Sequence, residues 1–174
     1  MRLPRSTPIL LPLLCLLLTA CSGSTPDSAR PAAVDFSAED TCVLNGLRPS
    51  DHPGPKAQLH LRGHEGPLFY CDTVEALHTL LVATPPQAVL AAYVQDTAAI
   101  DWHATHGHWI DARRAVYVNG ASRIGPLGRT LVSFAERGAA ERFIQEYGGQ
   151  LLAFEDITPD HVVIDGDALH DTSM

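Results

Sequence analysis

The sequence predicts an α+β protein that contains two tandem ββαβ units. Short runs of apolar and aromatic residues have the length and composition of strands, and two segments have the apolar spacing of amphipathic helices. The order strand, strand, helix, strand occurs twice along the chain. We therefore expect small, mostly antiparallel sheets with helices packed on one side, after a signal peptide and a flexible tether.

Four segments form the first predicted unit. We expect strands over residues 56–61, 67–71 and 88–96, and a helix over residues 72–83. Asp72 or Thr73 would be the helix N-cap, and Pro85-Pro86 would end the helix because proline cannot continue it. The apolar face of this helix would consist of Val74, Leu77, Leu81 and Val82.

The second predicted unit repeats this order. We expect strands over residues 114–118, 129–135 and 150–157, and a helix over residues 136–148. Asn119-Gly120 favours a tight turn after the first of these strands, and Gly148-Gly149 is typical of a helix end. The sequence therefore predicts a first module over residues 41–100 and a second module over residues 101–160.

Residues 1–20 have the pattern of an export signal. Arg2 and Arg5 precede a leucine-rich run, and small residues lead into Cys21. The run is shorter than the ~20 apolar residues that a spanning helix needs. The segment "LTAC" resembles a bacterial lipobox, which implies cleavage before Cys21 and a lipid anchor on that cysteine; the alternative is cleavage elsewhere, which frees a soluble protein. Because Ser22 is not the aspartate that favours inner-membrane retention, an outer-membrane anchor facing the periplasm is the favoured location.

Composition argues against nucleic acid as a partner. The whole chain has a formal net charge of −8, and the signal peptide carries two of its twelve basic residues and none of its twenty acidic ones. The mature chain is therefore more acidic still, and phosphate backbones repel it. Residues 21–40 are rich in Ser, Pro and Ala and predict a lipidated flexible tether, and residues 161–174 predict a flexible tail.

Two cysteines remain in the mature domain once the signal and the acylated Cys21 are set aside. They are Cys42 and Cys71, and no methionine lies between Met1 and Met174. In an oxidising periplasm they could form a disulfide. They could equally supply two thiolates to a soft metal such as Cu(I), with Zn(II) as the competitor. The residues alone leave both readings open.

The chain contains, in order, the motifs "CVLNGL", "DHPGPKAQ", "FYCDTVE", "GHWIDAR", "GPLGRTLVSFA" and "GGQLLAFEDI". Taken in series, they resemble the NosL family of copper-binding lipoproteins. The likeness runs from about residue 39 to residue 158, and the lipobox is part of it. The resemblance implies a periplasmic chaperone that binds Cu(I) and helps to assemble the copper centres of nitrous oxide reductase. Its expected partners are that enzyme and the enzyme's maturation machinery. The resemblance also implies a fold similar to treble clefs and to organomercurial lyase.

Two positions depart from the family pattern. Leu47 and Leu127 stand where the family commonly has methionine. An isobutyl group has no lone pair, so neither position can ligate copper, although Leu and Met are close in volume and packing can survive the exchange. Cys42 and Cys71 are the family's remaining soft atoms. A metal-free assembly adapter of the same family is therefore one alternative function.

The stretch around Cys42 predicts a folded knuckle. Asn45-Gly46 would turn residue 47 back towards Cys42, and Pro53-Gly54-Pro55 would fix the return path of the chain. His52, in this elbow, is the third candidate metal ligand. His103, His106 and His108 form a second cluster, of which His106 and His108 would share a strand face, but loop and strand roles are the simpler reading.

Nothing in the sequence indicates an enzyme. The chain has no glycine-rich phosphate loop, no HExxH and no nucleophile elbow. We expect a membrane-tethered copper carrier with Cys42, Cys71 and His52 as ligands, which could form a homodimer. The alternatives are the metal-free adapter and a thiol–disulfide protein that uses Cys42 and Cys71 as a redox pair.

Overall fold

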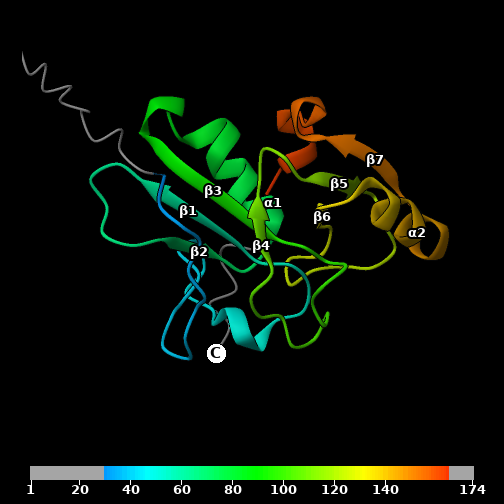
Figure 1. Cartoon of the computed structure of the whole chain (residues 1–174), viewed down its shortest axis with the longest axis horizontal. Helices are drawn as coiled ribbons and strands as arrows, with labels where there is room; N and C mark the ends of the chain where they lie inside the picture. Colours follow the sequence, from blue (N-terminus) through cyan, green and yellow to red (C-terminus); the bar gives the residue numbers. More distant parts are fainter. Residues whose placement is uncertain (1–29, 165–174) are drawn as a thin grey trace, which may run out of the picture.

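The computed structural model describes residues 30–164, which form two antiparallel sheets and two α-helices (Figure 1). The predicted signal peptide, the lipidation site Cys21 and the tail after residue 164 lie outside the described residues. The helices are α1 (Thr73–His78) and α2 (Arg137–Tyr147). The strands are β1 (Ala57–Leu61), β2 (Leu68–Tyr70), β3 (Val89–Gln95), β4 (Trp109–Asp111), β5 (Val116–Asn119), β6 (Val132–Phe134) and β7 (Gln150–Ala153). Short 3-10 turns occupy Pro49–Asp51, Pro86–Ala88, Phe154–Asp156 and Pro159–Val162, and a π-helical turn occupies Thr79–Ala83.

The first sheet has the strand order β2-β1-β3-β4, and all of its neighbours are antiparallel. In the central strand β1, side chains alternate between the two faces. Ala57 and Leu59 enter the main hydrophobic core beside α1. Gln58 and His60 are buried on the opposite, polar face, where the Gln58 amide contacts the His60 ring at 3.1 Å.

The second sheet has the order β6-β5-β7 and is also antiparallel. Tyr117 of β5 faces the main core, whereas Val118 faces a second core beneath α2. Phe143 of α2 packs in this second core against Phe134 of β6. In both sheets the first strand along the chain is central, and the two strands that flank it are separated in sequence by a helix. The likeness to treble clefs and to organomercurial lyase stays a prediction.

Helix α1 shares one core with both sheets. Asp72 is its N-cap, because its carboxylate accepts a hydrogen bond from the Val74 amide and Glu75 completes a capping box. The predicted amphipathic helix over 72–83 is only half right, because the backbone becomes π-helical at Thr79. This change of pitch turns Leu81 and Val82 out of the predicted apolar face, and they are 37% and 51% exposed.

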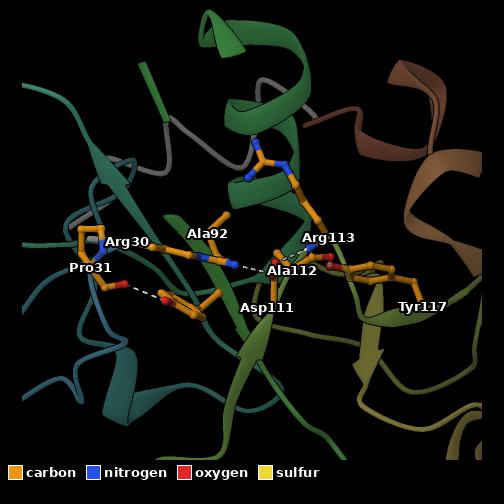
Figure 2. Close-up of polar contacts among 8 residues, drawn as sticks. Arg30, Pro31, Ala92, Asp111, Ala112, Arg113 and Tyr117 are labelled. Carbon is orange, nitrogen blue, oxygen red and sulfur yellow. Dashed lines mark hydrogen bonds and ion pairs between the residues drawn. The ribbon is translucent and has the colours of Figure 1, made fainter. Parts of the chain in front are cut away.

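Residues 30–36, which we call the strap, lie across the polar face of the first sheet. The Val34 backbone exchanges hydrogen bonds with the Gln58 side chain at 3.0 and 2.8 Å. Figure 2 shows Arg30 reaching the Asp111 carboxylate, and the Arg30 guanidinium also lies 5.0 Å from the centre of the Tyr93 ring. The flexible tether predicted over residues 21–40 therefore does not include the strap, because an ion pair and side-chain hydrogen bonds attach the strap to the sheet.

The strap continues into an aromatic cluster at the edge of the same sheet. The Asp35 carboxylate accepts hydrogen bonds from the Trp109 indole at 2.6 Å and from the Gly107 amide at 3.0 Å. Phe36 is buried and meets Phe69 edge-to-face, with the ring centres 6.0 Å apart. The strap thus joins β2 to β4 across the sheet.

The remaining differences from the predicted elements have local causes. The short edge strand β4 was missed because only three residues pair with β3. The predicted strand over 150–157 ends at Ala153, where the chain enters a 3-10 turn. The predicted tail over 161–174 includes Val162, which is fully buried in the main core. Among the described helices, none is long and apolar enough to cross a membrane.

Candidate functional site

The structure brings Cys42 and Cys71 together as a disulfide, with their Cα atoms 5.5 Å apart. Cys71 lies between the end of β2 and the Asp72 N-cap of α1. Cys42 lies beside β2, where it forms an isolated parallel bridge with Phe69. Both cysteines are buried, at 1% and 0% exposure. Of the two readings that the sequence left open, the structure shows the disulfide.

The predicted knuckle over residues 42–47 is confirmed. The Cys42 amide donates to the Leu47 carbonyl at 2.7 Å, and the Gly46 amide donates to the Cys42 carbonyl at 2.8 Å. Gly46 adopts a φ of 71°, which favours glycine. The Leu47 carbonyl oxygen also lies 3.7 Å from the Cys71 sulfur. The turn therefore folds residue 47 back onto the Cys42 backbone and the Cys71 sulfur.

The outer surface of the knuckle is apolar. Val43, Leu44 and Leu47 are 46%, 38% and 38% exposed. We call these three residues the knuckle patch. Asn45 lies between them and points inward, where its side-chain amide donates to the Glu75 carboxylate at 3.0 Å. The knuckle thus presents apolar side chains to solvent in the same turn that contains Cys42.

The Pro53-Gly54-Pro55 elbow is held by a buried lysine. The Lys56 ammonium donates to the Pro53 and Gly54 carbonyls at 2.9 and 2.6 Å, and the whole residue is 0% exposed. Gly54 adopts a φ of 80° and its amide donates to the Trp102 carbonyl at 2.7 Å. This contact ties the elbow to the loop before β4.

Two buried carboxyl groups accompany Lys56. Burial raises the pKa of Asp72 to about 6 and that of Glu75 to about 7, and it lowers the pKa of Lys56 to about 8. One Asp72 oxygen accepts from the Thr130 hydroxyl at 2.6 Å, while the other, Oδ2, has no hydrogen-bond partner. From the sequence, Asp72 is predicted only as a helix cap. Because Lys56 and Glu75 are distant in sequence, no local signal indicated this cluster.

The loop over residues 125–130 lies against Asp72. Gly125 and Gly128 exchange backbone hydrogen bonds at 2.8 and 3.1 Å, which makes a tight turn with Leu127 at its tip. A Cβ on Gly125 would come within 2.1 Å of the Asp72 Oδ2 atom. Leu127 is half-buried and lines a cavity of about 570 Å³ together with His161. Leu127, which stands at the second methionine position, therefore belongs to a loop that is fixed against Asp72, the residue after Cys71.

The structure does not complete a three-ligand metal site with the predicted residues. Within residues 30–164, no three or more His, Cys, Asp or Glu residues form a group able to hold a metal ion. His52 follows the 3-10 turn Pro49–Asp51 and is half-buried; burial and the nearby Lys56 ammonium lower its pKa. His52 stays a predicted third ligand.

The second histidine cluster does not form the predicted strand face. His103, His106 and His108 all precede β4 in a loop. His108 has a φ of 54°, a left-handed conformation that cannot continue a strand. His106 instead lies 3.4 Å from the Asp35 carboxylate of the strap. The prediction that His106 and His108 share a strand face is therefore wrong.

Comparison with known proteins gives consistent matches over the same region. The family model described as NosL matches residues 33–162. The copper-binding lipoprotein NosL of Achromobacter cycloclastes is 36% identical over 149 residues, covering 82% of this chain and 75% of the relative. The protein of the same name from Stutzerimonas stutzeri is 36% identical over 148 residues, covering 83% of this chain and 76% of the relative.

A solved structure has the same fold. The crystal structure of the copper chaperone NosL from Shewanella denitrificans matches with a TM-score of 0.69 and 33% sequence identity. The match covers 75% of this chain and 98% of that chain. The residues that the family model matches, 33–162, include both sheets.

Proposed function

This chain belongs to the NosL family, and on that premise we propose that it is a lipid-anchored periplasmic copper carrier. In this proposal the reduced Cys42 and Cys71 thiolates bind Cu(I), and the protein passes the metal on for assembly of nitrous oxide reductase. The relatives named copper-binding lipoprotein and copper chaperone support a binding role rather than catalysis. Acylation of Cys21, an outer-membrane location, tandem ββαβ modules and a possible homodimer are parts of the same proposal.

The pairing of two sulfur atoms is the observation that carries the proposal. Cys42 and Cys71 are separated by 29 positions in sequence, yet the fold places their Cα atoms 5.5 Å apart. Soft thiolates favour Cu(I), which is stable with few ligands. A site with two sulfur ligands suits a carrier, because a metal that is held by few atoms can be transferred to a recipient.

The donor set fits copper only in the reduced protein. A sulfur atom in a disulfide is not a thiolate, and the thiolate is the form of cysteine that ligates a metal. In the reduced protein the same backbone positions would hold two thiolates side by side beneath Leu47. Because Leu47 and Leu127 cannot contribute sulfur, the two cysteines would carry most of the affinity, with His52 as the predicted third donor.

Titration of reduced protein with Cu(I) against a competing chelator tests the proposal. We expect one copper per wild-type chain, a large loss of affinity in Cys42→Ser and in Cys71→Ser, and a smaller loss in His52→Ala. His103→Ala is a matched control in an exposed loop and should bind as wild type does. If reduced wild type and Cys42→Ser give the same curve, the cysteine site is excluded, and the metal-free adapter becomes the better description.

A further inference from the structure

We propose that the knuckle patch of Val43, Leu44 and Leu47 is the docking surface for a dithiol protein that reduces the Cys42–Cys71 disulfide. The partner is a protein with two neighbouring thiols, as in the thioredoxin class of reductants. This inference rests on the proposed function and adds a step to it: the site must be reduced by a partner before it can accept copper.

The need for a partner follows from burial of the disulfide. Reduction begins when a thiolate attacks one sulfur along the line of the S–S bond, and its rate depends on access to that sulfur. Cys42 is 1% exposed and Cys71 is 0% exposed. Cys42 is the first residue of the knuckle, and the Leu47 carbonyl at its other end lies 3.7 Å from the Cys71 sulfur. A reductant must therefore displace the knuckle or wait for it to open.

The patch supplies the surface that such a partner would hold. In the described part of the chain eight large apolar side chains are exposed, and three of these eight lie within the six residues of the knuckle. Scattered exposed apolar residues are ordinary, but a cluster marks an interaction site. This cluster begins at the residue after Cys42, so a partner bound to it is placed directly above the bond to be cleaved.

The two sulfur atoms differ in how firmly the fold holds them. Cys71 is fixed on both sides, because Tyr70 pairs with β1 and Asp72 caps α1. Cys42 is attached through a bridge to Phe69 and through the turn that closes at Leu47. Displacing the knuckle therefore moves Cys42 and leaves Cys71 in place, which makes Cys42 the sulfur that the partner attacks.

The exchange balances without any further reactant. A partner thiolate attacks the Cys42 sulfur, the S–S bond breaks, and Cys71 leaves as a thiolate. The second partner thiolate then attacks the partner's own sulfur in the mixed disulfide and releases Cys42 as a thiolate. The partner is oxidised to a disulfide by two electrons, and the cysteine pair is reduced by the same two electrons. The two protons of the partner thiols pass to solvent or to the new thiolates.

The test compares two reductants on the same purified mature protein, with thioredoxin as the protein probe and dithiothreitol as the small one. We expect Leu44→Ser and Leu47→Ser to slow reduction by thioredoxin about tenfold each, the size of effect typical of a central interface residue. Reduction by dithiothreitol should change less than about twofold. Val163→Ser is the control, because Val163 is 63% exposed and outside the patch. Thermal unfolding of each variant shows whether the fold is retained.

A trapping experiment identifies the attacked sulfur. Thioredoxin whose second active-site cysteine is replaced by serine should stop at a mixed disulfide, and peptide mass spectrometry should find it on Cys42. Equal slowing with both reductants, a mixed disulfide on Cys71, or a protein dimer that the patch substitutions dissociate would each overturn the proposal. Copper titration after chemical reduction is independent of docking, so its failure would count against the proposed copper function alone.

Discussion

Reduction of the Cys42–Cys71 disulfide should lower the stability of the domain by a predictable amount. The bond closes a loop with a sequence separation of 29. The chain-entropy relation for such a loop gives roughly 3.6 kcal/mol at 25 °C. With a urea dependence of about 2 kcal/mol per molar, which is typical of small domains, the midpoint of unfolding should fall by about 1.8 M.

Urea unfolding with and without reductant measures this shift. The matched control is the Cys42→Ser, Cys71→Ser double variant, which should unfold near the midpoint of the reduced wild type and should not respond to reductant. Cu(I) added to the reduced wild type should raise its midpoint again, because a ligand at about 1,000 times its dissociation constant contributes about 4.1 kcal/mol. A midpoint that reductant leaves unchanged would refute the assignment of a stabilising disulfide.

Three further predictions follow from the residues around the disulfide. Gly125→Ala should destabilise the domain by about 1–3 kcal/mol in urea unfolding, because the new Cβ would lie 2.1 Å from Asp72 Oδ2. The control Gly138→Ala, in α2, meets no such contact and should be neutral or stabilising. Burial raises the pKa of Asp72 to about 6 and that of Glu75 to about 7 in the folded protein, so the folded state binds more protons than the unfolded state between about pH 4 and pH 7. Stability should therefore fall as the pH rises through this window, and Glu75→Gln should flatten the profile; a Glu75→Gln profile as steep as that of wild type would contradict the cause. Leu47→Met should tighten Cu(I) binding by the reduced protein, because it adds a thioether donor to the turn that lies against the Cys71 sulfur. An unchanged titration would show that this side chain stays on the outer surface.

The local elements could be predicted because their signals are local. Short runs of apolar and aromatic residues predicted β1 and β3, and the capping residue Asp72 placed the start of α1 to within one residue. The Asn45-Gly46 pair predicted the knuckle, since a positive φ at glycine is a property of the turn itself. These features depend on residues that are neighbours in the sequence, so a single chain is enough to find them.

The parts that escaped prediction depend on contacts between distant residues. The strap was read as part of a flexible tether because its composition is that of a linker, and nothing near Val34 indicates that the Gln58 amide will pair with its backbone. The Lys56 cluster has the same character, because each member is an ordinary polar residue until the fold buries it beside the others. For Cys42 and Cys71 the sequence predicts a pair but not its oxidation state, because a disulfide and a two-thiolate site both require the same two sulfur atoms to be close together.

The reduced, metal-free protein is expected to be less stable than both the disulfide form and the copper-bound form. Oxidation stabilises the domain by roughly 3.6 kcal/mol through the closed loop. Copper at about 1,000 times its dissociation constant would contribute a similar amount, about 4.1 kcal/mol. The two contributions are exclusive, because the sulfur atoms proposed to bind the metal are those that form the disulfide bond. On the proposed function, a chain that has passed its copper to a recipient would regain stability when its two thiolates give two electrons to a disulfide-forming oxidant. The S–S bond that re-forms would also remove the thiolates that could take the metal back. Reduction by a partner would then set when the carrier is ready to be loaded again.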